Sequence, residues 1–286
     1  MMTPLHEQAQ KAIVKACETI GIPAELEYKG NHYRSDVMAF SNNRKYAFEI
    51  QITPQSLKKT QERQEKYIAD DVIGCWLFEK EPAKQNEEME HLPIFQLVIQ
   101  QDVLCVSLKG RKILPIDVFV QDFIKGRIKF CQTINPLPII NVIFVEMPCW
   151  KCGLINHIYF LAPFLSACNT EMIRDDEVMW TNHKFSFHPE IIKRVKEYSQ
   201  TEKGRNLVLA TIKERYSRTV GNSYMSFGCS ECDSIFGDWY VQEALVDAWY
   251  GDGVVGRYSF NVDFDLDMRQ KLPHWCHPGN HDFCEK

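Results

Sequence analysis

The chain lacks any long hydrophobic run. Its most apolar stretches, Leu137–Met147 and Leu154–Leu165, fall well short of the roughly 20 residues that a membrane-spanning helix needs. The N-terminal segment MMTPLHEQAQKAIVKACETIG is interrupted by polar residues throughout, so it has no apolar core of the signal-peptide type. We therefore expect a cytoplasmic protein, in a reducing compartment where paired cysteines more often hold metal than form disulfides.

The sequence also lacks an excess of basic residues. It has 33 Lys and Arg against 38 Asp and Glu, a net charge of -5, which excludes a globally basic nucleic-acid binder. The charge is uneven, because the segment 233–267 alone holds eight acidic residues and one basic residue, Arg257. Two local basic stretches, Lys109–Lys129 and Lys184–Arg218, are candidate contacts for a phosphate backbone; solvated helix faces are the alternative. We expect nucleic acid, and DNA in particular, as a partner, with the acidic segment facing away from it or binding a protein.

Internal repeats and heptads are absent, and the order of apolar patterns favours an α/β protein. The expected elements are a helix over His6–Ile20, strands over Ala24–Tyr33, Ser35–Phe40 and Lys45–Thr53, a helix over Gln55–Asp70, a strand over Val72–Phe78, further strands within Pro93–Leu108 and a helix over Leu114–Ile124. Composition changes near Ile134–Pro136, where the chain becomes rich in Cys, His and aromatic residues. We therefore expect two domains, 1–135 and 136–286.

The segment YRSDVMAFSNNRKYAFEIQIT, residues 33–53, reads as a hairpin that carries two acids. Asp36 opens its first strand, and Glu49 and Gln51 lie on one face of the second because side chains alternate along a strand. The other face carries apolar residues suited to a core. Two convergent carboxylates bind a hard cation such as Mg²⁺, which can polarise a phosphodiester and activate water. Solvated polar positions on an exposed sheet face are the alternative.

This arrangement resembles the PD-(D/E)xK nuclease superfamily and, more closely, the competence-protein CoiA-like nucleases. The resemblance rests on YRSDV, on FEIQIT, on the following LKKTQERQEKY and on the strand VIGCWLF with Trp76. An N-terminal helix with a histidine and a helix with Arg-x-x-x-Tyr are also features of those proteins. With the looser motif FVQDFIKG, the similarity covers about residues 5–130.

The resemblance implies a mixed sheet flanked by helices and a Mg²⁺- or Mn²⁺-dependent nuclease, with Asp36 and Glu49 as its metal-binding acids. Gln51 would take the place of the superfamily's lysine, as it does in the CoiA-like branch. A glutamine donates or accepts hydrogen bonds but carries no charge, so Lys45 or Lys58 could supply the missing cation.

Four further residues are candidate supporting groups. Arg63 and Tyr67 are four apart on the predicted second helix and therefore share a face. Arg63 has the planar fork that suits a phosphate or a carboxylate, although a surface contact is the plain alternative. His6 and Glu7 begin the first helix, where related folds place a histidine or an acid near the site; Glu7 could instead only complement the helix dipole.

Eleven cysteines stand out in this composition. Two Cys-x-x-Cys pairs, Cys149 with Cys152 and Cys229 with Cys232, match the ligand pattern of a tetrahedral structural zinc site. The interval between the pairs exceeds that of an ordinary zinc ribbon, so we expect a helical insertion at Pro189–Arg218. The second domain is accordingly predicted to be zinc-ribbon-like, with an α+β fold.

The tail HWCHPGNHDFC gathers further ligand-type side chains. A second zinc site could draw on His274, Cys276, His277, His281 and Cys284; a packed or solvated tail is the alternative. The remaining cysteines lie in apolar or mixed segments and read as small core residues; they are Cys17, Cys75, Cys105, Cys131 and Cys168.

The sequence thus predicts a metal-dependent nuclease that hydrolyses DNA phosphodiester bonds, in DNA processing, uptake or defence. One alternative is a catalytically weak or inactive nuclease fold that binds nucleic acid or a protein. The other is a zinc-organised adaptor whose acidic 233–267 segment contacts a protein partner.

Overall fold

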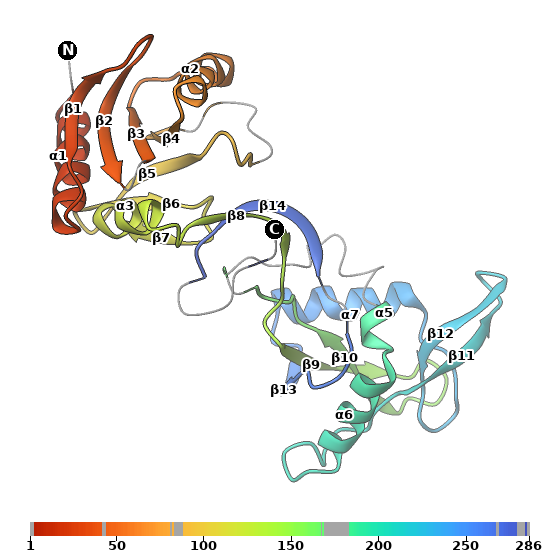
Figure 1. Ribbon diagram of the computed structural model, residues 1–286. Helices are drawn as coiled ribbons and strands as arrows, with labels where there is room; N and C mark the ends of the chain where they lie inside the picture. The colour runs from red at the N-terminus through yellow and green to blue at the C-terminus, as the bar shows by residue number, and fades with distance from the viewer. Residues whose placement is uncertain are drawn as a thin grey trace. The chain divides into compact units, whose positions relative to one another are not determined.

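The chain divides into two compact units (Figure 1). The first comprises Met1–Asn135, Ser166–Thr170 and Arg269–Lys286, and the second Pro136–Leu165 and Glu171–Met268. The computed structural model describes residues 3–41, 44–80, 82, 88–166, 168, 183–266, 269–278 and 284, without the side chains of 183, 184 and 249. Among the helices of these residues, none has the length and apolar character needed to cross a bilayer.

The first unit is a mixed α/β fold whose elements follow the order expected from the sequence. They are α1 (Pro4–Thr19), β1 (Ala24–Lys29), β2 (Arg34–Ser41), β3 (Arg44–Gln51), α2 (Leu57–Ala69), β4 (Val72–Phe78), β5 (Ile94–Gln100), β6 (Val103–Ser107), β7 (Ile113–Pro115), α3 (Ile116–Ile124), β8 (Lys129–Ile134) and β14 (Gln270–Cys276). Local signals explain the helix starts: the side chain of Thr3 caps α1, with Pro4 in its first turn, and the side chain of Ser56 caps α2.

Seven strands form one sheet in sequence order, β1 to β7. The pairs β3–β4 and β4–β5 are parallel and the others antiparallel. A large apolar cluster joins one face of the sheet to α1 and α3, and includes Phe48 and Ile50. A smaller cluster on the other face includes Tyr67 of α2 and Trp76 of β4. The sheet is therefore covered by helices on both faces, as a central sheet with parallel strands requires.

The C-terminal strand β14 belongs to the first unit, whereas the expected organisation assigned all of 136–286 to one zinc-binding domain. It pairs antiparallel with β8, with His274 opposite Cys131 and Cys276 opposite Lys129. Trp275 of β14 is buried in the same apolar cluster as Phe95. Burial of this large ring explains why the chain's last segment leaves the second unit.

The second unit has a smaller α+β fold. Its elements are β9 (Ile139–Pro148), β10 (Ile155–Leu161), α5 (His183–Ser186), α6 (Pro189–Ser199), β11 (Thr211–Ser217), β12 (Asn222–Gly228), α7 (Asp238–Tyr250) and β13 (Val254–Asn261). An antiparallel sheet has the order β10-β9-β13, and β11 and β12 form a separate hairpin. The insertion Pro189–Arg218 is helical only in its first part, because TIKERYS forms β11 and pairs with β12.

Candidate functional site

Asp36 and Glu49 lie at matching positions of the β2–β3 hairpin. The register that sets Val37 opposite Phe48 places these two acids opposite each other one step further along. The Ile50 N–H donates a 2.7 Å bond to Asp36 Oδ2, which ties the two strand ends together. Because side chains alternate, Phe48 and Ile50 enter the cluster under α1 and α3, and Glu49 points to α2. The hairpin therefore presents the two acids as the sequence predicts.

Glu49 is completely buried, so it is not a solvated position on an exposed face. Arg63 Nη2 donates to its Oε2 at 2.5 Å, and the Tyr67 hydroxyl donates to its Oε1. The Arg63 guanidinium also lies over the ring of Trp76, 4.9 Å from the ring centre. Burying an unpaired charge at this depth would cost on the order of several kcal/mol of folding free energy. The cation and the hydroxyl compensate that cost and fix the carboxylate in place.

The inner face of α2 is unusually polar for a helix packed on a sheet. Thr60, Gln64 and Tyr67 are its buried residues. Gln64 accepts a 2.7 Å bond from Trp76 Nε1, and a Cβ added at Gly74 would come within 2.1 Å of Gln64 Oε1. Only glycine admits this close approach. The buried network holds α2 in the position that brings Arg63 and Tyr67 to Glu49.

The two acids are electrostatically strained in the absence of a cation. Burial raises the pKa of Glu49 to about 8, and the Asp36 carboxylate adds to this rise, while Arg63 and the Tyr67 hydroxyl oppose it. Burial also raises the pKa of Asp36, against the Ile50 N–H and His6. A cation between the carboxylates would favour the ionised form of both.

The first turns of α1 approach Asp36. His6 Nε2 lies 3.3 Å from Asp36 Oδ1. Gln10 Nε2 donates to the Asp36 carbonyl at 3.3 Å and to Glu27 Oε1 at 2.8 Å, and Arg34 Nε lies 2.7 Å from Glu27 Oε2. Gln10, Glu27 and Arg34 were not among the predicted residues. The only sequence signal for Gln10 is its place one helical turn after His6.

Gln51, at the end of β3, is half-buried. Its amide nitrogen donates to the Ile50 carbonyl at 3.3 Å, and this side chain carries no charge. The structure places a cation against Glu49, but this cation is Arg63 from α2 and not a lysine.

Three of the predicted supporting residues have other surroundings. Lys45 Nζ lies 4.0 Å from Asp70 Oδ2, at the end of β3 opposite to Gln51. Lys58 is exposed in the first turn of α2. Glu7 is exposed and pairs with Lys11 at 2.6 Å, and this ammonium holds the pKa of Glu7 below its usual value.

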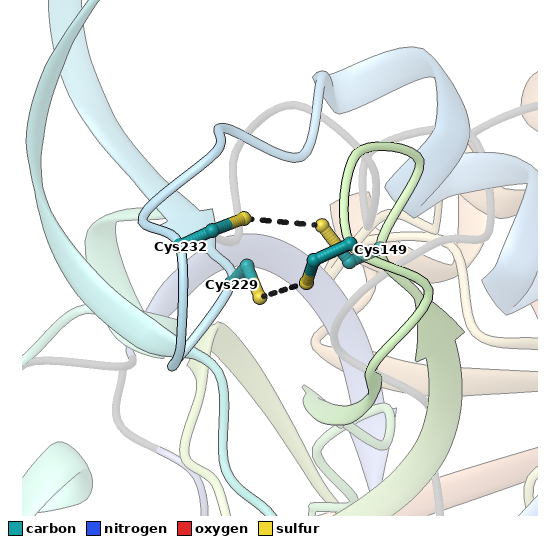
Figure 2. Close-up of side chains that lie close together, drawn as sticks. Cys149, Cys229 and Cys232 are labelled. Carbon is teal, nitrogen blue, oxygen red and sulfur yellow. Dashed lines mark hydrogen bonds between the residues drawn. The ribbon is translucent and has the colours of Figure 1, made fainter.

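The two Cys-x-x-Cys pairs converge in the second unit, as Figure 2 shows for the labelled Cys149, Cys229 and Cys232. Cys149 Sγ is 3.5 Å from Cys232 Sγ, and Cys152 Sγ is 3.6 Å from Cys229 Sγ. All four sulfur atoms lie within 4.8 Å of one another. This group can hold a metal such as zinc, because four thiolates at these separations suit a tetrahedral ion.

The two cysteine loops repeat one backbone pattern. In each loop the first cysteine's N–H donates five residues ahead, to Leu154 or Ser234, and its carbonyl accepts from the residue four ahead. That fourth residue, Gly153 or Asp233, has a positive φ. Equal loops of this kind direct two thiols each toward a common centre. The insertion between them therefore does not disturb the predicted ligand set.

Asn156 connects the two cysteine loops. It is fully buried; its amide nitrogen donates to Leu154 O at 3.0 Å and lies 3.5 Å from Cys229 Sγ. Its oxygen accepts from the Ser230 N–H at 2.8 Å. Burial opposes ionisation of Cys229, but the N–H groups of Cys232 and Glu231 and the Asn156 amide lower the pKa of this thiol to about 6.

A second group that can hold a metal lies in the first unit. It comprises Cys168, His274, Cys276 and Cys284. Cys168, which the sequence suggested as a core residue, is thus grouped with three residues of the tail. His277 is instead directed to Asp122, with Nε2 2.8 Å from Oδ2, and His281 lies outside the described residues.

An apolar groove of about 1380 Å³ runs beside the cysteine loops of the second unit. Its walls come from the end of β9, the β11–β12 turn and α7, and include Trp150, Trp239 and Tyr240. These aromatic side chains are 74%, 71% and 63% exposed. Five acidic residues line the groove, and no Lys or Arg is among its described lining residues; the acids are Glu146, Asp238, Glu243, Asp247 and Asp252.

Comparison with known proteins links the first unit to one family. Residues 3–104 match the family model described as "Competence protein CoiA, nuclease-like domain". No curated protein and no solved structure matches the chain. The matched range contains both acids of the hairpin together with His6, Arg63 and Tyr67. The match confirms the resemblance seen in the sequence: residues 3–104 form a domain similar to the nuclease-like domain of competence protein CoiA.

Proposed function

We propose that the protein is a Mg²⁺- or Mn²⁺-dependent nuclease that hydrolyses phosphodiester bonds in DNA, with a PD-(D/E)xK-type site. The observation that carries the proposal is the pair of carboxylates Asp36 and Glu49, one buried and one largely so, held opposite each other in a domain that matches a nuclease-like family. Buried acids with perturbed pKa values, one close to another, cluster at functional sites, which supports a catalytic role for this pair.

The residues present fit a hard divalent cation. Asp36, Glu49 and the Gln51 side chain offer oxygen atoms, the ligand type that Mg²⁺ and Mn²⁺ prefer. Each carboxylate oxygen has a second lone pair beyond the hydrogen bond that it accepts here. When bound, such an ion would polarise the phosphodiester and lower the pKa of water.

The chain's own groups would position that chemistry. Arg63 and Tyr67 hold the Glu49 carboxylate in one orientation, and His6 and the Ile50 N–H do the same for Asp36. Arg63 is 28% exposed, so its guanidinium can also face a phosphate group. In this proposal Arg63 provides positive charge where the wider superfamily has a lysine, and Gln51 orients water or contributes its carbonyl oxygen.

The DNA surface is proposed around the start of α2. The exposed cations there are Lys58 and Lys59. The stretch Lys109–Lys129 suits this role less well, because several of its cations have internal partners: Arg111 pairs with Glu88, and Arg127 with Asp122. We further propose a cytoplasmic location, which suits a chain whose eleven cysteines are all free thiols.

A cleavage assay with purified protein tests the proposal. We expect plasmid and single-stranded DNA to be cut with Mg²⁺ or Mn²⁺, and cleavage to fall by at least about 1,000-fold in Asp36→Asn and in Glu49→Gln, since each removes a charged ligand. Glu25→Gln is the matched control, because Glu25 is an exposed acid on β1. Cleavage that persists in both site variants at the wild-type rate would show that these acids do not carry the reaction.

For the four-cysteine group we propose a structural zinc ion. Every ligand position of a tetrahedral ion would be filled by protein thiolates, which leaves no open position for a substrate. The ion would fix β9, β12 and the start of α7, and so the walls of the apolar groove.

The groove supports a second candidate function, the binding of a protein partner through the zinc-organised unit. Its exposed aromatic rings and acidic rim fit a basic segment with apolar side chains, and the same acids would repel a phosphate backbone. Peptides selected on the intact protein from a random library should be basic and apolar, and should lose binding to Trp239→Ala. Enrichment of acidic peptides, or binding that Trp239→Ala leaves unchanged, would contradict this assignment.

A further inference from the structure

Cys168, His274, Cys276 and Cys284 form a second four-ligand group that lies entirely within the first unit. Their ligand atoms lie within 4.8 Å of one another, and Cys168 Sγ is 3.5 Å from His274 Nε2. Ligands at zinc distances of about 2.0–2.3 Å in a tetrahedron are separated by roughly 3.3–3.8 Å. All four residues are at most 4% exposed. The group therefore has the composition and the spacing of a closed structural zinc site.

The histidine of this group is oriented as a metal ligand. His274 Nδ1 lies 2.7 Å from the Leu272 carbonyl, a partner that can only accept, so the ring proton belongs on Nδ1. Nε2 then carries a lone pair and faces Cys168. A carbonyl that accepts the proton of the other ring nitrogen, and so sets the tautomer, is a regular feature of zinc-binding histidines.

Strand β14 connects the site to the core of the first unit. His274 and Cys276 are two residues apart and point to one side of the strand, while Trp275 points to the other. The Trp275 ring packs against Phe95, Phe123 and Phe130, with ring centres 5.7, 5.8 and 5.5 Å apart. An ion on one side of β14 would hold the strand in the register that buries this ring on the other.

We propose that Cys168, His274, Cys276 and Cys284 bind one zinc ion that fastens the C-terminal strand to the nuclease-like unit. All four ligands lie outside residues 3–104, so the site does not depend on the proposed nuclease function. Cys168 and Cys284 reach the site from two different segments, and the ion would join both to β14.

Metal content of the intact chain and of single variants tests the site. We expect two zinc ions per wild-type chain, one in Cys168→Ala, one in Cys152→Ala and none in the double variant. The matched control is Cys131→Ala, which removes a buried thiol that donates to the Cys284 carbonyl but is not in the ligand group; it should keep both ions. One zinc per chain, lost in Cys152→Ala and unaffected by Cys168→Ala, would overturn the proposal, as would iron in place of zinc.

X-ray absorption at the zinc edge keeps the proposal testable if Cys168→Ala does not fold. One site with four sulfur ligands and one with three sulfurs and a nitrogen give seven sulfurs and one nitrogen over two ions in the wild type. Four sulfurs per zinc without nitrogen would exclude the second site.

Proteolysis tests the fastening of β14. In the Cys168→Ala protein, the C-terminal segment should be cut by trypsin at least about tenfold faster than in Cys131→Ala; equal rates would show that no ion fastens β14.

Discussion

Glu49 is the residue at which stability and the proposed chemistry act against each other. Its carboxyl group is fully buried and faces Asp36 across the hairpin, so an ionised form is unfavourable until a cation binds. The Arg63 and Tyr67 donors reduce this cost without removing it. Replacing the buried acid by an uncharged isostere should therefore relieve strain in the protein without divalent cation while removing the metal ligand.

The pH dependence of stability provides a direct check. The folded protein keeps the Glu49 proton up to about pH 8, whereas the unfolded chain releases it near its ordinary pKa, about 4.3. The contribution of Glu49 to the free energy of unfolding is therefore fully present below that ordinary pKa. It is lost as pH rises to about 8, by at most about 1.4 kcal/mol per pH unit. In Glu49→Gln the free energy of unfolding lacks this dependence on pH. Measured by urea unfolding without added divalent cation, the variant should become increasingly more stable than the wild type between pH 5 and 8. If the free energies of unfolding of the wild type and Glu49→Gln changed in parallel with pH, they would contradict the raised pKa of Glu49. The control Glu25→Gln should follow the wild type.

Arg63 is expected to act through its planar fork as well as its charge. Arg63→Met removes the charge that faces Glu49 and should lower the cleavage rate about 100- to 1,000-fold, the usual effect of losing one charge-stabilising donor. Arg63→Lys keeps the charge but loses the stack on Trp76, so it should recover only part of the rate. Lys66→Met, an exposed cation on the same helix, is the matched control. Wild-type cleavage rates in Arg63→Met, with Mg²⁺ saturating, would remove Arg63 from the site.

At the residue scale, strand alternation and helix spacing were sufficient to place the main groups. Glu49 and the apolar Phe48 and Ile50 could be assigned to opposite faces because the period of a strand is two. Arg63, Tyr67 and His6 could be proposed from helix spacing and the family resemblance. Gln10 and Glu27 could not, because their contacts depend on how α1 and β1 lie against β2 near Asp36.

At the element scale, the two cysteine loops form a matched pair that Asn156 connects. Asn156→Ala should leave the four thiols in place but remove the amide that contacts Cys229 and connects the two loops, so zinc should transfer to a competing chelator about 10- to 100-fold more readily. The release is followed with a chromogenic chelator. Asn222→Ala in the β11–β12 hairpin, an exposed asparagine, should release zinc as the wild type does. Equal release from Asn156→Ala would mean that Asn156 has no part in metal retention.

The elements of the first unit were predictable because their apolar periods are regular and their ends carry caps and turns. The second unit was less predictable. TIKERYS has basic and acidic residues that suit a helix, but pairing with β12 makes it a strand, since tertiary pairing overrides propensity. No local pattern in the sequence indicates that Trp239 and Tyr240 of α7 line an exposed groove.

At the scale of the whole molecule, sequence distance hid the second ligand group. Cys168 and His274 are separated by most of the second unit, so no local spacing relates them, while the tail alone suggested His277 as a ligand. In the structure His277 binds Asp122 instead. The net charge is also divided between the units, because the whole acidic 233–267 segment belongs to the second unit. The first unit is therefore close to neutral despite the overall charge of -5, which is compatible with the proposed binding of DNA.

The last strand should therefore contribute to the stability of a unit whose family match ends at residue 104. Trp275 is 8% exposed and fills a space among the Phe rings of that unit, so Trp275→Ala should destabilise it by about 3–5 kcal/mol, the usual cost of removing a buried aromatic side chain. Trp239→Ala, an exposed tryptophan of the second unit, should unfold as the wild type does. Chemical unfolding followed by circular dichroism measures both. The four-cysteine group lies in the second unit. With Co²⁺ bound there in place of the proposed zinc, its visible absorption should persist in Trp275→Ala after the first unit has unfolded. Simultaneous loss of both signals at the wild-type midpoint would show instead that β14 does not stabilise the first unit.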